Sequence, residues 1–147
     1  MKLTSNQKAY LAGFLDADGS IYVQAKKNST YKFGYQIAPY IVFYQSSKSN
    51  LFTKVYSLIL GGHIRERKDG VTEYILSKKD EIIHFVNIVL PFLLLKQKQA
   101  ELLLQILKQK EFVKDEKDFE KILQLCNEFS NLNYSKKRKI RSIARRD

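Results

Sequence analysis

Apolar positions spaced three or four residues apart near the start of the chain predict a helix. These positions are Leu11, Phe14 and Leu15. Thr4, followed three residues later by Gln7, matches the capping box that begins many helices. We therefore expect a helix over residues 5–17, with Gly19 supplying a left-handed turn after it.

From residue 20 the apolar period changes to two, which predicts strands with one buried and one polar face. In the first strand the apolar set is Ile21, Val23 and Ala25. A second strand is expected over residues 35–45, where Ile37, Ile41 and Phe43 share one side. Pro39 lies inside this strand and donates no ladder hydrogen bond, so the sequence implies a bulge or an edge position there.

Helix and turn signals alternate through the rest of the chain. Helical spacing over residues 51–59 is stopped by Gly61-Gly62. Strand patterns at 64–67 and 71–76 flank Lys68-Asp69-Gly70, whose Asp-Gly pair is a strong hairpin signal. Three more helices are expected at residues 79–90, where Ser77 is a possible cap, at 96–110 and at 118–132.

The order of these elements predicts an α+β fold. The predicted order is helix, two strands, helix, two strands and helix, followed by C-terminal helices. This order favours antiparallel hairpins over a parallel sheet. The length of 147 residues suits one domain, residues 1–147, with a basic tail at about 133–147 that holds seven basic residues and one acid.

Charge narrows the possible partners. The chain has 26 Lys and Arg against 15 Asp and Glu, a net charge of +11, which is typical of proteins that bind nucleic acid or an anionic membrane. No apolar run reaches the length of a membrane span, and the N-terminus lacks the apolar stretch of a signal peptide. The placement of the basic residues on strands and turns favours nucleic acid over an anionic membrane, so we expect no membrane association. The single Cys126 excludes an internal disulfide framework and favours a reducing, intracellular compartment. Its spacing from Ile122 and Phe129 predicts a core position.

Two acids stand at the end of the first predicted helix, where they are electrostatically unfavourable. A helix C-terminus carries a partial negative charge, so Asp16 and Asp18 should each cost about 0.3–1 kcal/mol there. A divalent cation held by a carboxylate and by free carbonyls at the helix end would compensate. The alternative is that both acids serve a turn before Gly19.

Small residues line one face of the same helix. Ala9, Gly13 and Ala17 are spaced by four, and Ala12 lies beside them. Such spacing lets two helix backbones approach closely. The alternative is that the helix packs tightly on its own sheet.

The polar face of the predicted sheet is rich in hydrogen-bond donors. Its residues are Gln24, Lys26, Asn28, Gln36, Tyr40, Tyr44, Arg65 and Arg67. Gln and Asn can bind adenine in two places and Arg can bind guanine, so this face is suited to the DNA major groove. The alternatives are a solvated face and, for the two arginines, pairing with Glu73 worth less than about 1 kcal/mol.

The stretch 11–19, LAGFLDADG, resembles the signature of the LAGLIDADG homing endonucleases. The resemblance is to the single-motif, homodimeric branch encoded by group I introns, and it runs from about Tyr10 to Lys139; the sequence has no second copy of the signature. It implies an αββαββα core with a curved four-stranded antiparallel sheet. It also implies a staggered double-strand break in a long pseudo-palindromic DNA target, with Mg²⁺ as cofactor and Mn²⁺ as a substitute.

The resemblance assigns the catalytic positions. Asp18 and the backbone carbonyl of Ala17 would hold the metal, Gln45 would position water, and Lys96 would lie near the scissile phosphate. Asp16 would cap or pack the helix end. Relatives often carry a further cation where this chain has Ser49, and Lys48 is only a nearby substitute.

The resemblance also assigns the interfaces. The DNA-binding set adds Thr30 and Tyr31 to the polar face listed above, and the tail residues Ser135, Lys136, Arg138 and Lys139 look like phosphate contacts. Val42 is apolar where relatives are often polar, so it would meet a thymine methyl group or nothing. The dimer interface would contain Ala9, Ala12 and Gly13.

Other functions remain open at this level. The same basic face could hold intron RNA, as a splicing maturase would, or bind DNA without cutting it. A protein of the membrane surface would leave the acids of the first helix unexplained. His63 and His84 form no zinc motif, so both are interpreted as structural. Many Lys, Asn and Ile residues suggest an A·T-rich genome, which points to a chloroplast, a mitochondrion or a prokaryotic cytoplasm.

Overall fold

The computed structural model describes residues 2–48 and 52–133. Its elements in chain order are α1 (Ser5–Asp18), β1 (Gly19–Lys27), β2 (Tyr35–Ser46), α2 (Thr53–Tyr56), β3 (His63–Glu66), β4 (Val71–Leu76), α3 (Lys79–Val89), the 3₁₀ turn η1 (Leu90–Phe92), α4 (Gln97–Lys110) and α5 (Glu116–Leu132). The predicted α+β class and the predicted order of elements are confirmed.

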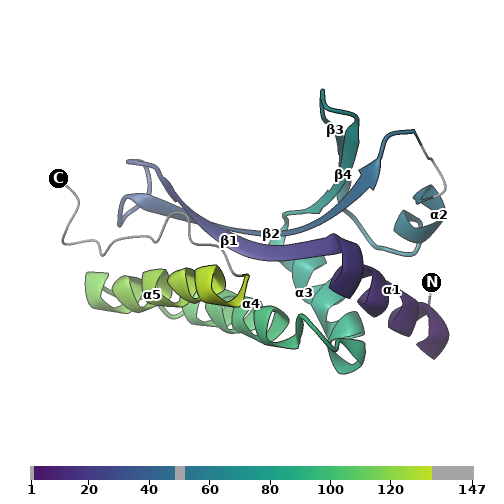
Figure 1. Cartoon of the computed structure of the whole chain (residues 1–147). Helices are drawn as coiled ribbons and strands as arrows, with labels where there is room; N and C mark the ends of the chain where they lie inside the picture. Colours follow the sequence, from purple (N-terminus) through teal and green to yellow (C-terminus); the bar gives the residue numbers. More distant parts are fainter. Residues whose placement is uncertain (1, 49–51, 134–147) are drawn as a thin grey trace.

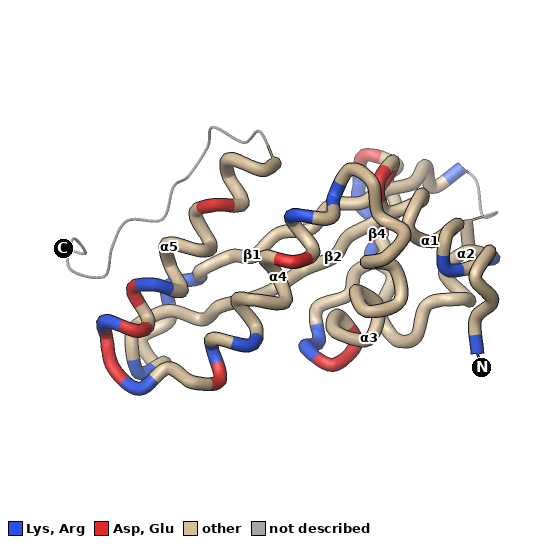
Figure 2. The backbone as a smooth tube through the Cα atoms, turned by 90° about the horizontal axis from the view of Figure 1, so that it is seen from below, with Lys and Arg blue, Asp and Glu red and all other residues tan. Residues whose placement is uncertain are grey.

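The four strands form one antiparallel sheet in the order β1-β2-β4-β3. β1 and β2 sweep as a long curved ribbon over α4 and α5, while α1 and α3 lie under the other end of the sheet (Figure 1). All of these helices cover the same face, so the opposite face is left open. On the helical side, Lys and Arg alternate with Asp and Glu along α4 and the α4–α5 connection (Figure 2).

The core lies between the sheet and the helices. Its fully buried side chains include Leu11 and Leu15 of α1, Phe43 of β2 and Phe85 of α3. Cys126 of α5 is buried as well, and burial raises the pKa of its thiol to about 12, so this cysteine is an inert core residue.

Local signals place several boundaries where the sequence predicts them. Thr4 and Gln7 form the capping box of α1, with both reciprocal hydrogen bonds present. Gly70 adopts a φ of 82° in the β3–β4 hairpin. Pro39 pairs with Val23 of β1, and β2 pairs with β4 only from Ile41 onward. Pro39 therefore occupies a local edge of a central strand, as one of the two predicted alternatives requires.

Three local predictions are wrong. Gly19 is extended (φ −99°) and opens β1; a Cβ there would lie 2.9 Å from the Leu15 carbonyl oxygen, so close packing and not a left-handed turn requires glycine. Ser77 does not cap α3, whose N-cap is Lys78 without a side-chain hydrogen bond. α2 is one short turn, Thr53–Tyr56. Beyond it the backbone makes bonds between residues three apart, Leu58 N–H to the Val55 carbonyl and Ile59 N–H to the Tyr56 carbonyl, so the α-helix does not continue to Gly61.

Among the described residues, no helix combines the length and the apolar character that a membrane crossing requires.

Candidate active site and nucleic-acid interface

The end of α1 is fastened to the segment before α4 through Asp16. One carboxylate oxygen accepts the Leu94 N–H at 2.9 Å and the other accepts the Lys96 N–H at 3.0 Å. The Lys96 ammonium donates to the Asp16 carbonyl oxygen at 2.7 Å. Backbone amides and a lysine therefore offset the acidic helix end, and this geometry supports a structural role for Asp16.

Replacement of Asp16 by alanine should destabilise the fold. Hydrogen bonds to a charged group contribute about 1.5–3 kcal/mol each, and because this carboxylate is partly exposed we expect a total loss of about 2 kcal/mol. Urea unfolding at a fixed protein concentration measures this loss. The control is Asp80→Ala, which removes an exposed acid from the first turn of α3. Equal stability of the two variants would contradict the fastening role.

Asp18 occupies a different environment at the same helix end. Its carboxylate is exposed, and Oδ2 accepts a hydrogen bond from Gln45 Nε2 at 2.8 Å. The fold thus brings together two predicted site residues that lie 27 positions apart. Gln45 stands at the end of β2, on the helical side of the sheet, opposite the buried Thr72 of β4. Thr72 in turn shares a hydrogen bond of 2.7 Å with the Ser47 hydroxyl.

The donor set at Asp18 suits a hard cation with few protein ligands. The Asp18 carboxylate and the last carbonyls of α1, including that of Ala17, are oxygen ligands. Among the described residues, no three or more His, Cys, Asp or Glu side chains are grouped to hold a metal. Mg²⁺ fits such a sparse site because it keeps several waters and shares ligands with phosphate. Water and phosphate oxygens could complete the coordination that these residues leave open.

Lys96 and Lys48 have different positions. Lys96 is partly buried and bound to the same helix end as Asp18, so the structure brings all three predicted catalytic residues to one region. Lys48 is exposed just after β2. Ser49 lies outside the described residues.

The open face of the sheet gathers the predicted DNA-binding residues of the strands. The register pairs Lys26 with Gln36, Tyr22 with Tyr40, and Tyr44 with Glu73, so all of these share the face opposite the helices. Lys26 Nζ donates to the Tyr40 hydroxyl at 2.5 Å and lies 5.0 Å from the Tyr40 ring centroid. Gln24 belongs to the same face and is exposed.

The β1–β2 turn presents a second group of predicted contacts. The Asn28 side-chain oxygen accepts from the Thr30 N–H at 3.1 Å and from the Thr30 hydroxyl at 2.6 Å. Tyr31 is 42% exposed at the same turn. The internal hydrogen bonds fix the shape of the turn, and they leave the Asn28 amide nitrogen as its donor toward a ligand.

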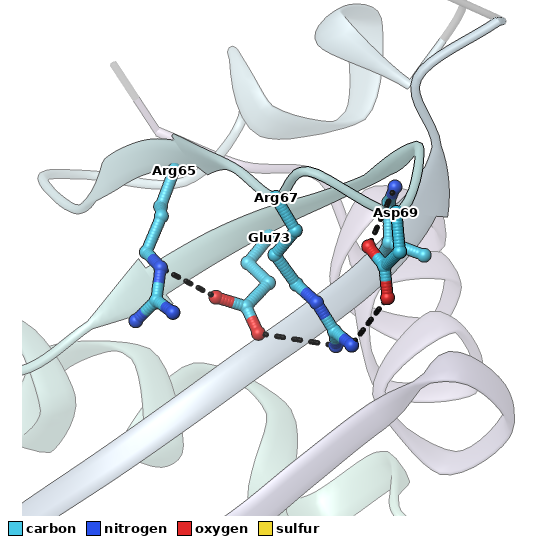
Figure 3. A network of polar contacts seen from close by, with 5 residues as sticks. Arg65, Arg67, Asp69 and Glu73 are labelled. Carbon is cyan, nitrogen blue, oxygen red and sulfur yellow. Dashed lines mark hydrogen bonds and ion pairs between the residues drawn. The ribbon is translucent and has the colours of Figure 1, made fainter.

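A carboxylate lies between the two arginines of the open face, as Figure 3 shows. Glu73 contacts Arg65 Nε at 3.5 Å and Arg67 Nη1 at 3.6 Å, and Asp69 contacts Arg67 Nη2 at 2.6 Å. The pairing of both arginines with Glu73, which the sequence analysis gave as an alternative to base contacts, is therefore present. Because Glu73 is largely buried and the arginines are not, it orients both guanidinium groups toward the open side.

The centre of this face is less polar than predicted. Val42 is only 2% exposed, so of its two alternatives the structure supports the one without a base contact. Tyr22 and Tyr40 stack with their centroids 5.2 Å apart. Burial, followed by the neighbouring Tyr44 and Tyr40, raises the pKa of Tyr22 to about 12, so its hydroxyl stays protonated and can donate.

The exposed small-residue face of α1 contains all the predicted residues except Ala12. Ala9, Gly13 and Ala17 are exposed, but Ala12 is fully buried with Leu11 and Leu15 and belongs to the core of its own protomer. A Cβ added at Gly13 would meet nothing within 4 Å. Packing within the protomer therefore does not explain this glycine.

Sequence reasoning missed an apolar extension of this face. Tyr10 is 59% exposed, and Leu94 and Leu95 are 88% and 73% exposed. The Leu94 amide bonds to Asp16, so these leucines adjoin the end of α1. The signal was the unbroken apolar run that follows Pro91. The predicted tail contacts Ser135, Lys136, Arg138 and Lys139 lie outside the described residues.

Comparisons with known proteins agree on one family. The family described as LAGLIDADG endonuclease matches residues 11–106. The DNA endonuclease I-CreI of Chlamydomonas reinhardtii is 40% identical over 137 residues, covering 90% of this chain and 82% of its own. The DNA endonuclease I-CvuI of Chlorella vulgaris is 34% identical over 133 residues, covering 90% and 83%. A crystal structure of I-CvuI with the I-CreI target, in 2 mM Mg and with the DNA not cleaved, superposes with a TM-score of 0.85 at 30% identity, covering 93% of this chain and 88% of the other.

Proposed function

This chain belongs to the LAGLIDADG endonuclease family and is a homing DNA endonuclease, and we propose that it acts as a metal-dependent homodimer on a long pseudo-palindromic site. The observation that carries the proposal is the Asp18 carboxylate, which the end of α1 presents toward solvent beside Gln45 and next to an exposed stripe of small residues. We further propose that the product is a staggered double-strand break.

Each side chain of the site has a proposed task. Asp18 and the Ala17 carbonyl would hold Mg²⁺, or Mn²⁺ as a substitute, and an ion held there would supply an activated water and relieve charge on the leaving oxygen. The Gln45 amide fixes the Asp18 carboxylate and orients water beside it. The Lys96 ammonium, held at the same helix end, stabilises negative charge on the scissile phosphate.

The need for two protomers follows from the number of sites. One chain carries one Asp18 site, but a double-strand break requires two cuts. Ala9, Gly13 and Ala17 allow two α1 helices to approach closely, and Leu94 and Leu95 extend the contact with apolar surface. A two-fold dimer would read two half-sites, which explains a pseudo-palindromic target.

The open sheet face supplies the proposed DNA contacts. Its curved two-stranded ribbons suit the major groove, where Gln24, Gln36, Arg65 and Arg67 can read base edges. We assign the basic residues of the tail to phosphates, with Lys26 and the β1–β2 turn beside the reading face. The net charge of +11 favours association with DNA. We place the enzyme in an organelle or a prokaryotic cytoplasm.

Incubation of the protein with a plasmid that carries its intron-insertion site tests the proposal. We expect linear DNA when Mg²⁺ is present and none in excess chelator, because the single carboxylate of each site cannot activate water alone. Retention of cutting in chelator would overturn the metal-dependent mechanism. Tight DNA binding with no cutting at any Mg²⁺ concentration would favour a binding module, and stimulation of intron splicing under those conditions would favour a maturase.

A further inference from the structure

An aromatic cluster lies between α1, α2 and the sheet, directly beside the proposed site. Tyr56 of α2 stacks on Tyr74 with centroids 4.1 Å apart and an interplanar angle of 15°. Its ring also lies 6.2 Å from Phe43 and 6.3 Å from Phe14. Phe14 stands one helical turn before Asp18, so the cluster reaches the carboxyl end of α1.

The two stacked tyrosines differ in their hydroxyl groups. The Tyr74 hydroxyl donates to the Gly61 carbonyl oxygen. The Tyr56 hydroxyl is buried and has no hydrogen-bond partner among the described residues, in a side chain that is only 5% exposed. Buried hydroxyl groups in native proteins are almost always paired with protein or with ordered water. We therefore expect the Tyr56 hydroxyl to have a hydrogen-bond partner.

The sheet register places the Tyr56 cluster next to the polar end of the site. Phe43 pairs with Tyr74, and two residues farther along the same strands Gln45 pairs with Thr72. Gln45 holds Asp18. The negative charge of Asp18 also acts on the Tyr56 hydroxyl. Burial is the largest cause, followed by Tyr74 and then Asp18, and together they raise the pKa of Tyr56 to about 12. The hydroxyl is therefore protonated at neutral pH and available as a donor.

We propose that Tyr56 is a positioning residue of the active site, whose hydroxyl donates to one water that hydrogen-bonds the Asp18 carboxylate. Gln45 restrains this carboxylate from the sheet, and the bridged water restrains it from the core side. The inference rests on the proposed role of Asp18 in metal binding. A donor in this position fixes the orientation of a metal-binding carboxylate without touching the metal or the DNA.

Replacement of Tyr56 by phenylalanine keeps the ring stack and removes only the hydroxyl. We expect the Mg²⁺ concentration for half-maximal cleavage to rise about tenfold, because partners of a metal ligand contribute about 10–100-fold to metal affinity or activity. DNA affinity should stay unchanged. Tyr74→Phe is the matched control, since it removes a hydroxyl from the same stack that bonds elsewhere. A Mg²⁺ midpoint that is unchanged in Tyr56→Phe, or raised equally in both variants, would overturn the proposal.

A double-mutant cycle in thermal unfolding provides a readout that does not depend on cutting. We expect the change in melting temperature caused by Tyr56→Phe to differ between the wild-type and the Asp18→Ala backgrounds, because alanine removes the oxygen that accepts from the bridging water. The corresponding change for Tyr74→Phe should be equal in both backgrounds. Additive changes for Tyr56→Phe would overturn the water bridge. Normal cutting by Asp18→Asn alone would instead overturn the proposed function, so the two failures are distinguishable.

Discussion

Replacement of Asp18 by asparagine should lower DNA cleavage at least about a thousandfold and leave target binding nearly unchanged. Asparagine has the shape of aspartate, and its side-chain oxygen can still accept the Gln45 hydrogen bond of 2.8 Å. It lacks the negative charge that a hard cation requires. Metal catalysis of this kind contributes several kcal/mol to transition-state stabilisation, and each 1.4 kcal/mol is about a factor of ten in rate.

Single-turnover cleavage and a gel-shift assay, both with the intron-insertion duplex, measure the two quantities separately. Asp80→Asn is the control, because it makes the same chemical change at an exposed carboxylate on α3. We expect the control to cut and bind as the wild type does. If Asp18→Asn cuts at the wild-type rate, the metal lies elsewhere and the proposed site is wrong.

Structural features that depend on residues close together in the sequence could be predicted. The capping box of Thr4 and Gln7, the Asp-Gly hairpin and the alternating faces of β1 each depend on residues within one turn or one strand. These signals were sufficient for the order of elements and for the α+β class. The LAGFLDADG stretch added the family, and with it the expectation that Asp18, Gln45 and Lys96 would meet.

Contacts between distant segments were not predictable in the same way. The hydrogen bonds of Asp16 to Leu94 and Lys96 join positions 78 and 80 residues apart. They provide the structural partners that offset the unfavourable charge of Asp16 at the helix C-terminus. The burial of Ala12 depends on which side of α1 meets the sheet. Small residues on neighbouring faces of a helix look alike in sequence, so Ala12 was assigned to the wrong face.

Gly13→Glu should convert the protein to a monomer and abolish double-strand cutting. Glycine in a helix interior is about 1 kcal/mol less favourable than alanine, yet nothing within the protomer lies within 4 Å of a Cβ at this position. Close approach of a second α1, as we propose, would explain the glycine. A glutamate there would bury an unpaired charge, which costs about 3–5 kcal/mol and weakens the dimer by more than about a hundredfold.

Sedimentation velocity over a range of concentrations measures the expected dissociation, and plasmid cleavage measures its consequence. Gln105→Glu is the control, because it adds the same charge at an exposed position of α4. Since Gly13 has open space around it within one chain, circular dichroism of Gly13→Glu should show the fold of the wild type. A folded Gly13→Glu variant that remains dimeric and linearises the plasmid would place the protomer contact on another surface. Leu95→Glu tests the apolar extension of the proposed α1 contact by the same measurements.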